Sequence, residues 1–174
     1  SIPEVLVRAM ADRGPELEGV TVYSGFAVGR ADAPYCRPEY RESFLVNSLF
    51  VANNIRRWLA DGYGQSTPAF LGEIPGLFRD GTLPVDVALL NVSRPNEEGY
   101  CSYGVSADLA VSAVECARTV IAQINPAMPF SYGDALIHTS RIAAAVEVDD
   151  PLVEVPTAVP TEIERRIGAH IAEL

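Results

Sequence analysis

The chain has 174 residues, of which 48% are hydrophobic and 21% are charged, a composition typical of one folded globular domain with a single core. Its 23 acidic and 13 basic residues give a formal charge of −10. This charge argues against nucleic acid and anionic membranes as partners, because both bind basic surfaces. The apolar runs have the length of strands, so the sequence predicts neither a membrane span nor an apolar leader.

Short predicted strands alternate with predicted helices along the chain. In chain order, the predicted elements are a helix over 1–13, a strand over 20–23, a helix over 38–45, a strand over 49–51, a helix from 53 or 54 to 61, a helical turn at 74–78, a strand over 85–92, a helix over 106–117, a strand over 119–124, two candidate strands at 137–140 and 143–148, and a helix over 161–174. This alternation predicts an α/β fold, layered α/β/α with a mainly parallel sheet.

The first and last predicted helices each begin with a capping box. Ser1 with Glu4 and Thr161 with Glu164 have the required spacing, with Ser or Thr at the N-cap and Glu three residues later. An α/β domain would normally place a strand before the first helix, and the last helix runs to Leu174. We therefore expect residues 1–174 to form one domain that is truncated at both ends.

A polar loop follows the most apolar predicted strand. Residues 85–92 are nearly all apolar, as in a strand covered on both faces, and residues 93–100 (SRPNEEGY) change to turn chemistry. Open α/β sheets bind ligands at the carboxyl ends of their strands. We therefore predict that polar residues after several strands line one side of a ligand cleft. These residues are Ser24, Gly25, Asn53, Asn54, Ser93, Asn96, Gly99, Tyr100 and Ser102.

The pair Asn53 and Asn54 begins a predicted helix directly after a short predicted strand. Either asparagine is a suitable N-cap, and the free N–H groups of such a helix end also bind phosphate. Both interpretations stay open, since a capped helix end can also face a ligand. The Gly-rich segment 24–30 lacks the spacing of a nucleotide-binding loop.

No catalytic constellation is evident from the residues themselves. His138 and His170 are the only histidines, and we interpret His138 as structural and His170 as a surface residue of the last helix. Glu73, in a predicted loop, is the first acidic residue to examine for a functional role. No triad or paired-carboxylate pattern accompanies these residues.

Three widely spaced cysteines indicate a reducing compartment. Cys36, Cys101 and Cys116 have no metal-ligand spacing, so no metal site is predicted. Their odd number argues against a disulfide framework, so we expect reduced thiols and a cytoplasmic location. Cys116 falls on a predicted helix and fits core packing, whereas Cys101, in the polar loop, is open to a reactive or a structural interpretation.

Five blocks of sequence carry a family resemblance. They are YC-x-PE at 35–39, TPAF at 67–70, IP-x-LFR-x-G at 74–81, PVDVAL through GYCS-x-GVS at 84–106, and VIAQ-x-NP-x-MP at 120–129. In this order they resemble the N-terminal domain of the acetyl-CoA hydrolase/transferase family, which includes 4-hydroxybutyrate and butyryl-CoA:acetate CoA-transferases. Arg94 replaces a usual proline, and Ala52–Asn54 replaces a common glycine pair, which puts the choice of substrate in doubt.

The resemblance implies a CoA-transferase that moves CoA between an acyl-CoA and a short-chain carboxylate of the 4-hydroxybutyrate, butyrate or acetate type. In this family a glutamate forms an acyl anhydride and then a glutamyl-CoA thioester, from which the second carboxylate takes the CoA. That glutamate lies in a C-terminal domain, so it is expected beyond Leu174, and no catalytic residue is predicted within the chain. Coenzyme A is then a substrate and no cofactor is expected. The C-terminal CoA-transferase domain is an implied partner.

Two other functions stay open. One is hydrolysis of acyl-CoA, in which water replaces the carboxylate acceptor. The other is a non-catalytic interaction module with the same fold. For each of these three functions, we expect the chain alone to have no transferase or hydrolase activity.

Large apolar side chains in predicted loops indicate an uncovered surface. Phe26, Tyr63, Phe70, Met128 and Phe130 lie outside the regular strand and helix patterns. A domain that forms half of a site leaves apolar area bare where its partner packs. We therefore expect a homo-oligomer, and we expect the chain by itself to dimerise or aggregate unless it is joined to its other half.

Overall fold

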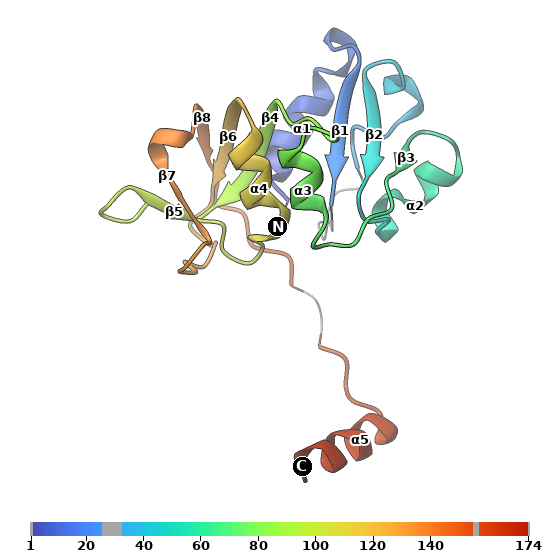
Figure 1. Ribbon diagram of the computed structural model, residues 1–174, viewed down its shortest axis with the longest axis vertical. Coiled ribbons are helices and arrows are strands. Elements are labelled where there is room, and N and C mark those ends of the chain that lie inside the picture. Colours follow the sequence, from blue (N-terminus) through green and yellow to red (C-terminus); the bar gives the residue numbers. More distant parts are fainter. Residues whose placement is uncertain (1, 26–32, 155–156, 174) are drawn as a thin grey trace.

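Helices cover both faces of two parallel sheets. The computed structural model describes residues 2–25, 33–154 and 157–173. Figure 1 shows α3 and α4 in front of the strands and α1 behind them, and the strands of both sheets run in the same direction. The predicted class, a layered α/β/α fold with mainly parallel strands, is confirmed. Within the described residues, the parallel strands form two three-stranded sheets.

The first sheet contains β1 (Val20–Ser24), β2 (Phe44–Ser48) and β3 (Gln65–Ser66), all parallel, in the order β1-β2-β3. The helix predicted over 38–45 is wrong. Its proline signal starts only a 3-10 turn, Pro38–Tyr40. The strand predicted over 49–51 lies earlier in the chain, because Phe44 and Val46 alternate with an exposed Leu45 and so bury one face of an extended chain.

The second sheet contains β4 (Val87–Val92), β6 (Thr119–Ile124) and β8 (Ala144–Glu147), in the order β4-β6-β8. Helix α4 (Asp108–Cys116) connects β4 to β6, as the predicted βαβ unit requires. Even-numbered residues of β4 and β6 are apolar and pack in one cluster with Val114 of α4, and all of them except the half-buried Ile124 are buried. Odd-numbered residues therefore face the opposite side, where α1 lies.

A small antiparallel ladder lies beside the second sheet. Strand β5 (Tyr100–Ser102) pairs with β7 (Leu136–His138), with Cys101 opposite Ile137. Both candidate strands near the end of the sequence are confirmed, since β7 overlaps the range 137–140 and β8 lies within the range 143–148. Strand β5 was not predicted, because three residues directly after a polar turn give no alternating pattern.

Two helices begin without the side-chain caps that were predicted. Helix α1 (Glu4–Asp12) has Pro3 at its N-cap, and Ser1 lies outside the described residues. Helix α2 (Asn53–Ala60) has Ala52 at its N-cap with no side-chain bond, so the asparagine cap is wrong and Asn53 is the first helical residue. The short helix α3 (Ile74–Arg79) matches the predicted helical turn.

Helix α5 (Glu162–Ala172) lies apart from the two sheets (Figure 1). Its predicted capping box is confirmed, because the Thr161 hydroxyl accepts from the Glu164 N–H at 3.2 Å and the Thr161 N–H donates to the Glu164 carboxylate at 2.6 Å. Every residue of α5 is exposed. Residues 148–154 and 157–160, which lead to α5, contain no helix or strand.

The core consists of three clusters that the helices hold together. One lies between α4 and the second sheet, and another lies between α1, α2 and the first sheet. The third joins α3 and α4 to Tyr23 of β1. Because α4 takes part in two of these clusters, it packs against both sheets.

We expect Gly104→Ala to destabilise the chain more than Gly133→Ala does. Both glycines have a left-handed φ, +63° and +78°, which costs an L-residue about 1–2 kcal/mol. A Cβ at Gly104 would also overlap the Met128 side chain and the Pro129 carbonyl, whereas a Cβ at Gly133 meets nothing within 4 Å. Overlap in a packed region adds about 1–3 kcal/mol. Urea denaturation that gives equal losses for the two variants would contradict this packing.

Candidate functional site

Buried carboxamides lie at the carboxyl ends of β4 and β6, on the side that faces α1. Asn91 and Gln123 occupy the odd-numbered positions nearest these ends, and Asn125 follows β6 directly. Their exposed fractions are 8%, 1% and 1%. Buried amides need hydrogen-bond partners, and here they bond to main-chain groups of Ile2, Val5 and Asp150.

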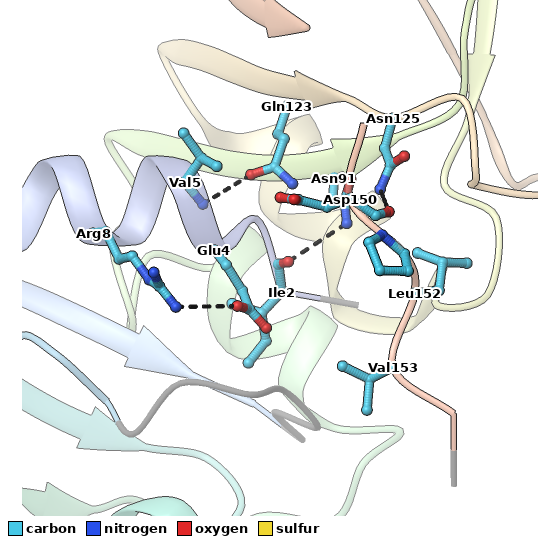
Figure 2. Close-up of a pocket in the computed structure, with 11 residues that line it drawn as sticks. Ile2, Glu4, Val5, Arg8, Asn91, Gln123, Asn125, Asp150, Leu152 and Val153 are labelled. Carbon is cyan, nitrogen blue, oxygen red and sulfur yellow. Dashed lines mark hydrogen bonds and ion pairs between the residues drawn. The ribbon is translucent and has the colours of Figure 1, made fainter. Parts of the chain in front are cut away.

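Gln123 and Asn91 hold the beginning of α1 (Figure 2). The Gln123 Oε1 atom accepts the Val5 N–H at 3.0 Å, and Asn91 Nδ2 donates to the Ile2 carbonyl at 3.5 Å. The Val5 N–H is one of the first groups of a helix, which have no partner inside the helix. The positive end of the α1 dipole therefore points to the ends of β4 and β6.

A cavity of about 250 Å³ lies beside these carboxamides. Asn125 Nδ2 donates to the Asp150 carbonyl at 2.8 Å and so holds residues 150–153 across one wall. Glu4 and Arg8 of α1, 3.7 Å apart, line the opposite wall (Figure 2). Pockets for drug-sized ligands span about 300–1,000 Å³, so this cavity has room for a small group and not for a complete nucleotide-bearing ligand.

Two of the predicted site residues, Ser93 and Ser102, use their hydroxyl groups in hydrogen bonds to the protein's own backbone. The Ser93 hydroxyl accepts the Ser102 N–H at 2.8 Å and donates to the Arg94 carbonyl at 2.9 Å. The Ser102 hydroxyl accepts the Ser131 N–H at 2.9 Å and donates to the Ser131 carbonyl at 2.9 Å. Both residues are buried, so these hydroxyls shape the loop from within.

The residues between them form an exposed turn. Asn96 Oδ1 accepts the N–H groups of Glu98 and Tyr100, at 3.1 and 2.8 Å. Gly99 has φ +82°, and a Cβ there would lie 2.9 Å from His138 Nε2. Tyr100 stacks edge-on against the His138 ring at 5.0 Å. The tip of the turn, with exposed Asn96 and Tyr100, is the part of this loop that a ligand can reach.

The other predicted residues lie at the carboxyl edge of the first sheet. Ser24 ends β1, and its carbonyl accepts the Leu49 N–H at 2.8 Å. Gly25 packs closely on α4, because a Cβ there would lie 2.8 Å from Leu109 Cδ1. The Oδ1 atom of Asn54 in the first turn of α2 is buried and accepts no hydrogen bond from the described residues. That oxygen can accept a bond from a bound donor.

The nine predicted residues fall into two groups. Figure 1 places the turn before β5 on one side of β4, and it places β1 and α2 on the other side. Asn91 and Gln123, under α1, were not among the predicted residues. A polar residue near the end of each apolar strand, Asn in VALLNV and Gln in TVIAQI, was the signal that would have identified them. That all nine residues line one cleft stays a prediction.

The apolar loop residues have mixed surroundings. Phe70 is 81% exposed, whereas Met128 is 4% exposed and packs under Gly104, so the prediction of an uncovered Met128 is wrong. Tyr63 and Phe130 are half-buried, and Phe26 lies outside the described residues. Phe50 and Leu71 are exposed and were not predicted.

Comparison with known proteins identifies the family. The profile of the acetyl-CoA hydrolase/transferase N-terminal domain matches residues 1–159. The chain belongs to the acetyl-CoA hydrolase/transferase family.

Curated relatives and solved structures agree with this assignment. The chain is 38% identical over 172 residues to the 4-hydroxybutyrate coenzyme A transferase of Clostridium kluyveri, covering 99% of this chain and 40% of that protein. It is 33% identical to the succinyl-CoA:cyclohexane-1-carboxylate CoA transferase of Geobacter metallireducens, covering 99% and 38%. RipA from Yersinia pestis superposes with a TM-score of 0.86 at 29% identity, covering 98% of this chain and 42% of that one. The chain thus spans about two fifths of the length of these relatives.

The described part of this acetyl-CoA hydrolase/transferase domain has no buried carboxylate. Glu4 is half-buried, and every other described Asp or Glu is exposed. In the same residues, no group of three His, Cys, Asp or Glu side chains is arranged to hold a metal ion. None of the helices that the structure describes has the length and apolar character needed to cross a membrane.

The buried cysteines of the family domain are poor nucleophiles. Burial raises the pKa of Cys36 to about 11 and also raises the pKa of Cys101. Cys101 is completely buried in β5, which favours the structural interpretation of this residue. The three cysteines form no disulfide.

We expect Cys116 to react first with a thiol reagent in the native protein. Cys116 is half-buried, whereas Cys36 and Cys101 are buried and their raised pKa values keep them protonated at neutral pH. Mass spectrometry after timed alkylation at pH 8 measures the order of labelling, and a Cys116→Ser variant is the control. Modification of Cys101 before Cys116 would contradict the burial of β5.

Proposed function

We propose that the chain is the N-terminal domain of a CoA-transferase that moves CoA between an acyl-CoA and a short-chain carboxylate of the 4-hydroxybutyrate, butyrate or acetate type. The main support is the 38% identity over nearly the whole chain to a 4-hydroxybutyrate coenzyme A transferase. Other relatives with names that specify CoA transfer act on different carboxylates. Transfer is therefore the common feature, and the carboxylate is what varies among them.

The proposed reaction requires a nucleophile that the described residues do not supply. A glutamate carboxylate attacks the acyl-CoA carbonyl, so the thioester C–S bond breaks, an acyl anhydride forms and CoA thiolate leaves. The thiolate then attacks the glutamyl carbonyl and releases the first carboxylate, which leaves a glutamyl-CoA thioester. A second carboxylate repeats these steps in reverse. Exposed acidic residues lack the dry surroundings that protect an anhydride from water, so we place this glutamate beyond Leu174.

In this proposal the chain supplies one wall of the site. The carboxyl edge of the sheets carries buried amides, a helix N-terminus and the exposed turn at Asn96 and Tyr100. Amide donors and a helix dipole stabilise a carboxylate or a developing oxyanion without being charged themselves. The cavity of about 250 Å³ has room for a short acyl group, which is compatible with a small carboxylate at this edge.

We propose that α5 packs on a C-terminal domain of the same protein. Ile163, Ile167 and Ile171 are spaced four residues apart, so they share one face of α5, and they are 70%, 54% and 64% exposed. The family match ends at residue 159, before α5 begins. An isolated helix of eleven residues is marginal in water, so α5 needs a surface to cover its isoleucine face.

We also propose a cytoplasmic location and a homo-oligomeric state. Three free thiols support a reducing compartment. Phe50, Phe70 and Leu71 are large apolar side chains that are at least half exposed, and such residues support an association surface.

The activity test compares residues 1–174 with the full-length protein. We expect full-length protein to transfer CoA from acetyl-CoA to 4-hydroxybutyrate or butyrate and to carry a covalent CoA adduct that intact-mass measurement detects. Residues 1–174 should show neither property. CoA release by full-length protein that is equally fast without an acceptor would support the hydrolase instead. Full-length protein with no turnover and no adduct would support the interaction module.

The role of α5 is tested with Ile167→Asp and Ala169→Asp. Ala169 lies on the opposite face of the helix, so it serves as a control for the new charge. In residues 1–174 neither variant should change the melting temperature, because both positions are exposed. In full-length protein, Ile167→Asp should lower the free energy of unfolding by about 2–4 kcal/mol, the loss typical of a truncated core isoleucine. Ala169→Asp should lower it by less than half of that amount. Equal effects of the two substitutions would contradict the proposed packing.

A further inference from the structure

Strand β8 is the outermost strand of the second sheet, on the side away from the first sheet (Figure 1). Within the described residues it pairs with β6 alone, so its other edge presents backbone N–H and C=O groups with no strand beside them. Ala144 and Ala145 are both exposed. Because successive residues of a strand face opposite sides, this edge is accessible from both faces of the sheet.

The β8 edge lacks the features that prevent edge strands from pairing. Natural edges are kept very short, bulged, or interrupted by charged residues and proline, and β3, at the outer edge of the first sheet, has only two residues. The register of β8 against β6 runs from Ala144 to Glu147 without a bulge. Residues 142–148 (IAAAVEV) contain one charged residue and no proline. Since alanine side chains are small, a second strand can approach this backbone closely.

Two charged residues of opposite sign flank the apolar residues 142–146. Arg141 and Glu147 are exposed, and neither forms an ion pair with another described residue. The Arg141 guanidinium donates to the Val114 carbonyl of α4 at 3.1 Å, which places it on the α4 face of the sheet. Glu147 pairs in register with Ile124, which packs in the cluster under α4. The two charges are therefore on the same face of the edge.

Residues 141–147 (RIAAAVE) are complementary to themselves in the antiparallel direction. When Ala144 of one copy lies opposite Ala144 of a second copy, each other side chain meets one of similar size or of opposite charge. The opposing pairs, each of which occurs twice, are Arg141 with Glu147, Ile142 with Val146, and Ala143 with Ala145. Opposite charges and apolar groups stabilise antiparallel strands when they lie directly opposite each other.

We propose that β8 pairs antiparallel with β8 of a second copy of this chain, around a two-fold axis at Ala144. This interface refines the homo-oligomer proposed above. The axis is perpendicular to the sheet, so α4 of both copies and both Arg141–Glu147 pairs lie on one face. The second sheets of the two copies, three strands each, then form one continuous sheet. Such a contact uses the same surface on both copies and closes on itself.

Other arrangements of this edge lose the complementarity. A shift by one residue places Arg141 opposite Val146 and removes both ion pairs. Parallel pairing in register places Arg141 beside Arg141 and Glu147 beside Glu147, and like charges at opposing positions are destabilising. A partner of a different sequence does not require the pattern to be symmetric about Ala144. The symmetry therefore favours a second copy of the chain as the partner.

Cysteine cross-linking of the full-length protein tests the register. Directly opposing Cβ atoms of antiparallel strands lie about 4.5–5.5 Å apart, whereas diagonal neighbours lie about 7–8 Å apart, which is too far for a disulfide. In a Cys116→Ser background under mild oxidation, Ala144→Cys should form an intermolecular disulfide at least about tenfold faster than Ala145→Cys. Position 145 is equally small and exposed, but its two copies are diagonal neighbours in the proposed pairing. Equal rates, or no cross-link above that of the background protein, would reject the proposal.

Sedimentation of the full-length protein tests the charge pairs. Glu147→Arg places arginine opposite Arg141 in both symmetric pairs, so the dissociation constant of the dimer should rise at least about tenfold. Adding Arg141→Glu restores opposite charges and should restore the wild-type dissociation constant. Glu18→Arg makes the same change in charge at an exposed position before β1, so it is the matched control and should have no effect.

These measurements separate the interface from the homo-oligomer and from the enzymatic function. A dimer that Glu147→Arg and Glu18→Arg weaken equally would reject the β8 interface and leave the homo-oligomer in place. A wild-type protein that sediments as a monomer would reject both. Both readouts measure association, so they do not depend on CoA transfer.

Discussion

The hydrogen bond between the Gln123 carboxamide and the first turn of α1 sets the geometry at the carboxyl edge of the second sheet. Strand β6 alternates apolar residues that face α4 with residues that face α1, and Gln123 is the buried polar member of the second set. The carboxamide accepts the Val5 N–H, which has no hydrogen-bond partner inside the helix. It thereby fixes where α1 begins and directs the positive end of α1 to the ends of β4 and β6.

This constraint connects the fold to the proposed chemistry. A CoA-transferase must hold an acyl group and a thiolate close to one carboxylate while it excludes water. Buried amides of Asn91, Gln123 and Asn125, which are satisfied largely by main-chain groups, give a rigid polar wall that carries no formal charge. The described residues contain no buried carboxylate, and the proposed reaction takes its nucleophile from another part of the protein, whose relatives are about two and a half times as long as this chain.

The sequence predicted those elements in which the hydrophobic periodicity and the residues that mark the element's ends indicate the same structure. The unit of β4, α4 and β6 has an apolar strand, a polar loop and a helical repeat in succession, and the structure contains all of them. Residues 38–48 were mispredicted because Pro38 is a strong helix signal, whereas tertiary burial of Phe44 and Val46 favours an extended chain. The asparagine cap failed because Ala52 occupies the N-cap position.

The candidate site was harder to predict than the fold. Ser93 and Ser102 have the residue types of a ligand-binding loop, and only their hydrogen bonds show that they stabilise it from within. Gln123 lies inside an apolar run, where single-sequence reasoning assigns it to the strand. Its role becomes visible only when α1, 118 residues earlier in the chain, is placed beside it.

Hydrogen exchange of full-length protein, with and without bound acyl-CoA, tests most directly the claim that the carboxyl edge of the strands faces the substrate. The account predicts slower exchange on binding at residues 91–102 and 123–125, and no change at the opposite edge, in the segments that precede β1, β4 and β6. Protection confined to the segments before these strands, with none at their carboxyl ends, would contradict it.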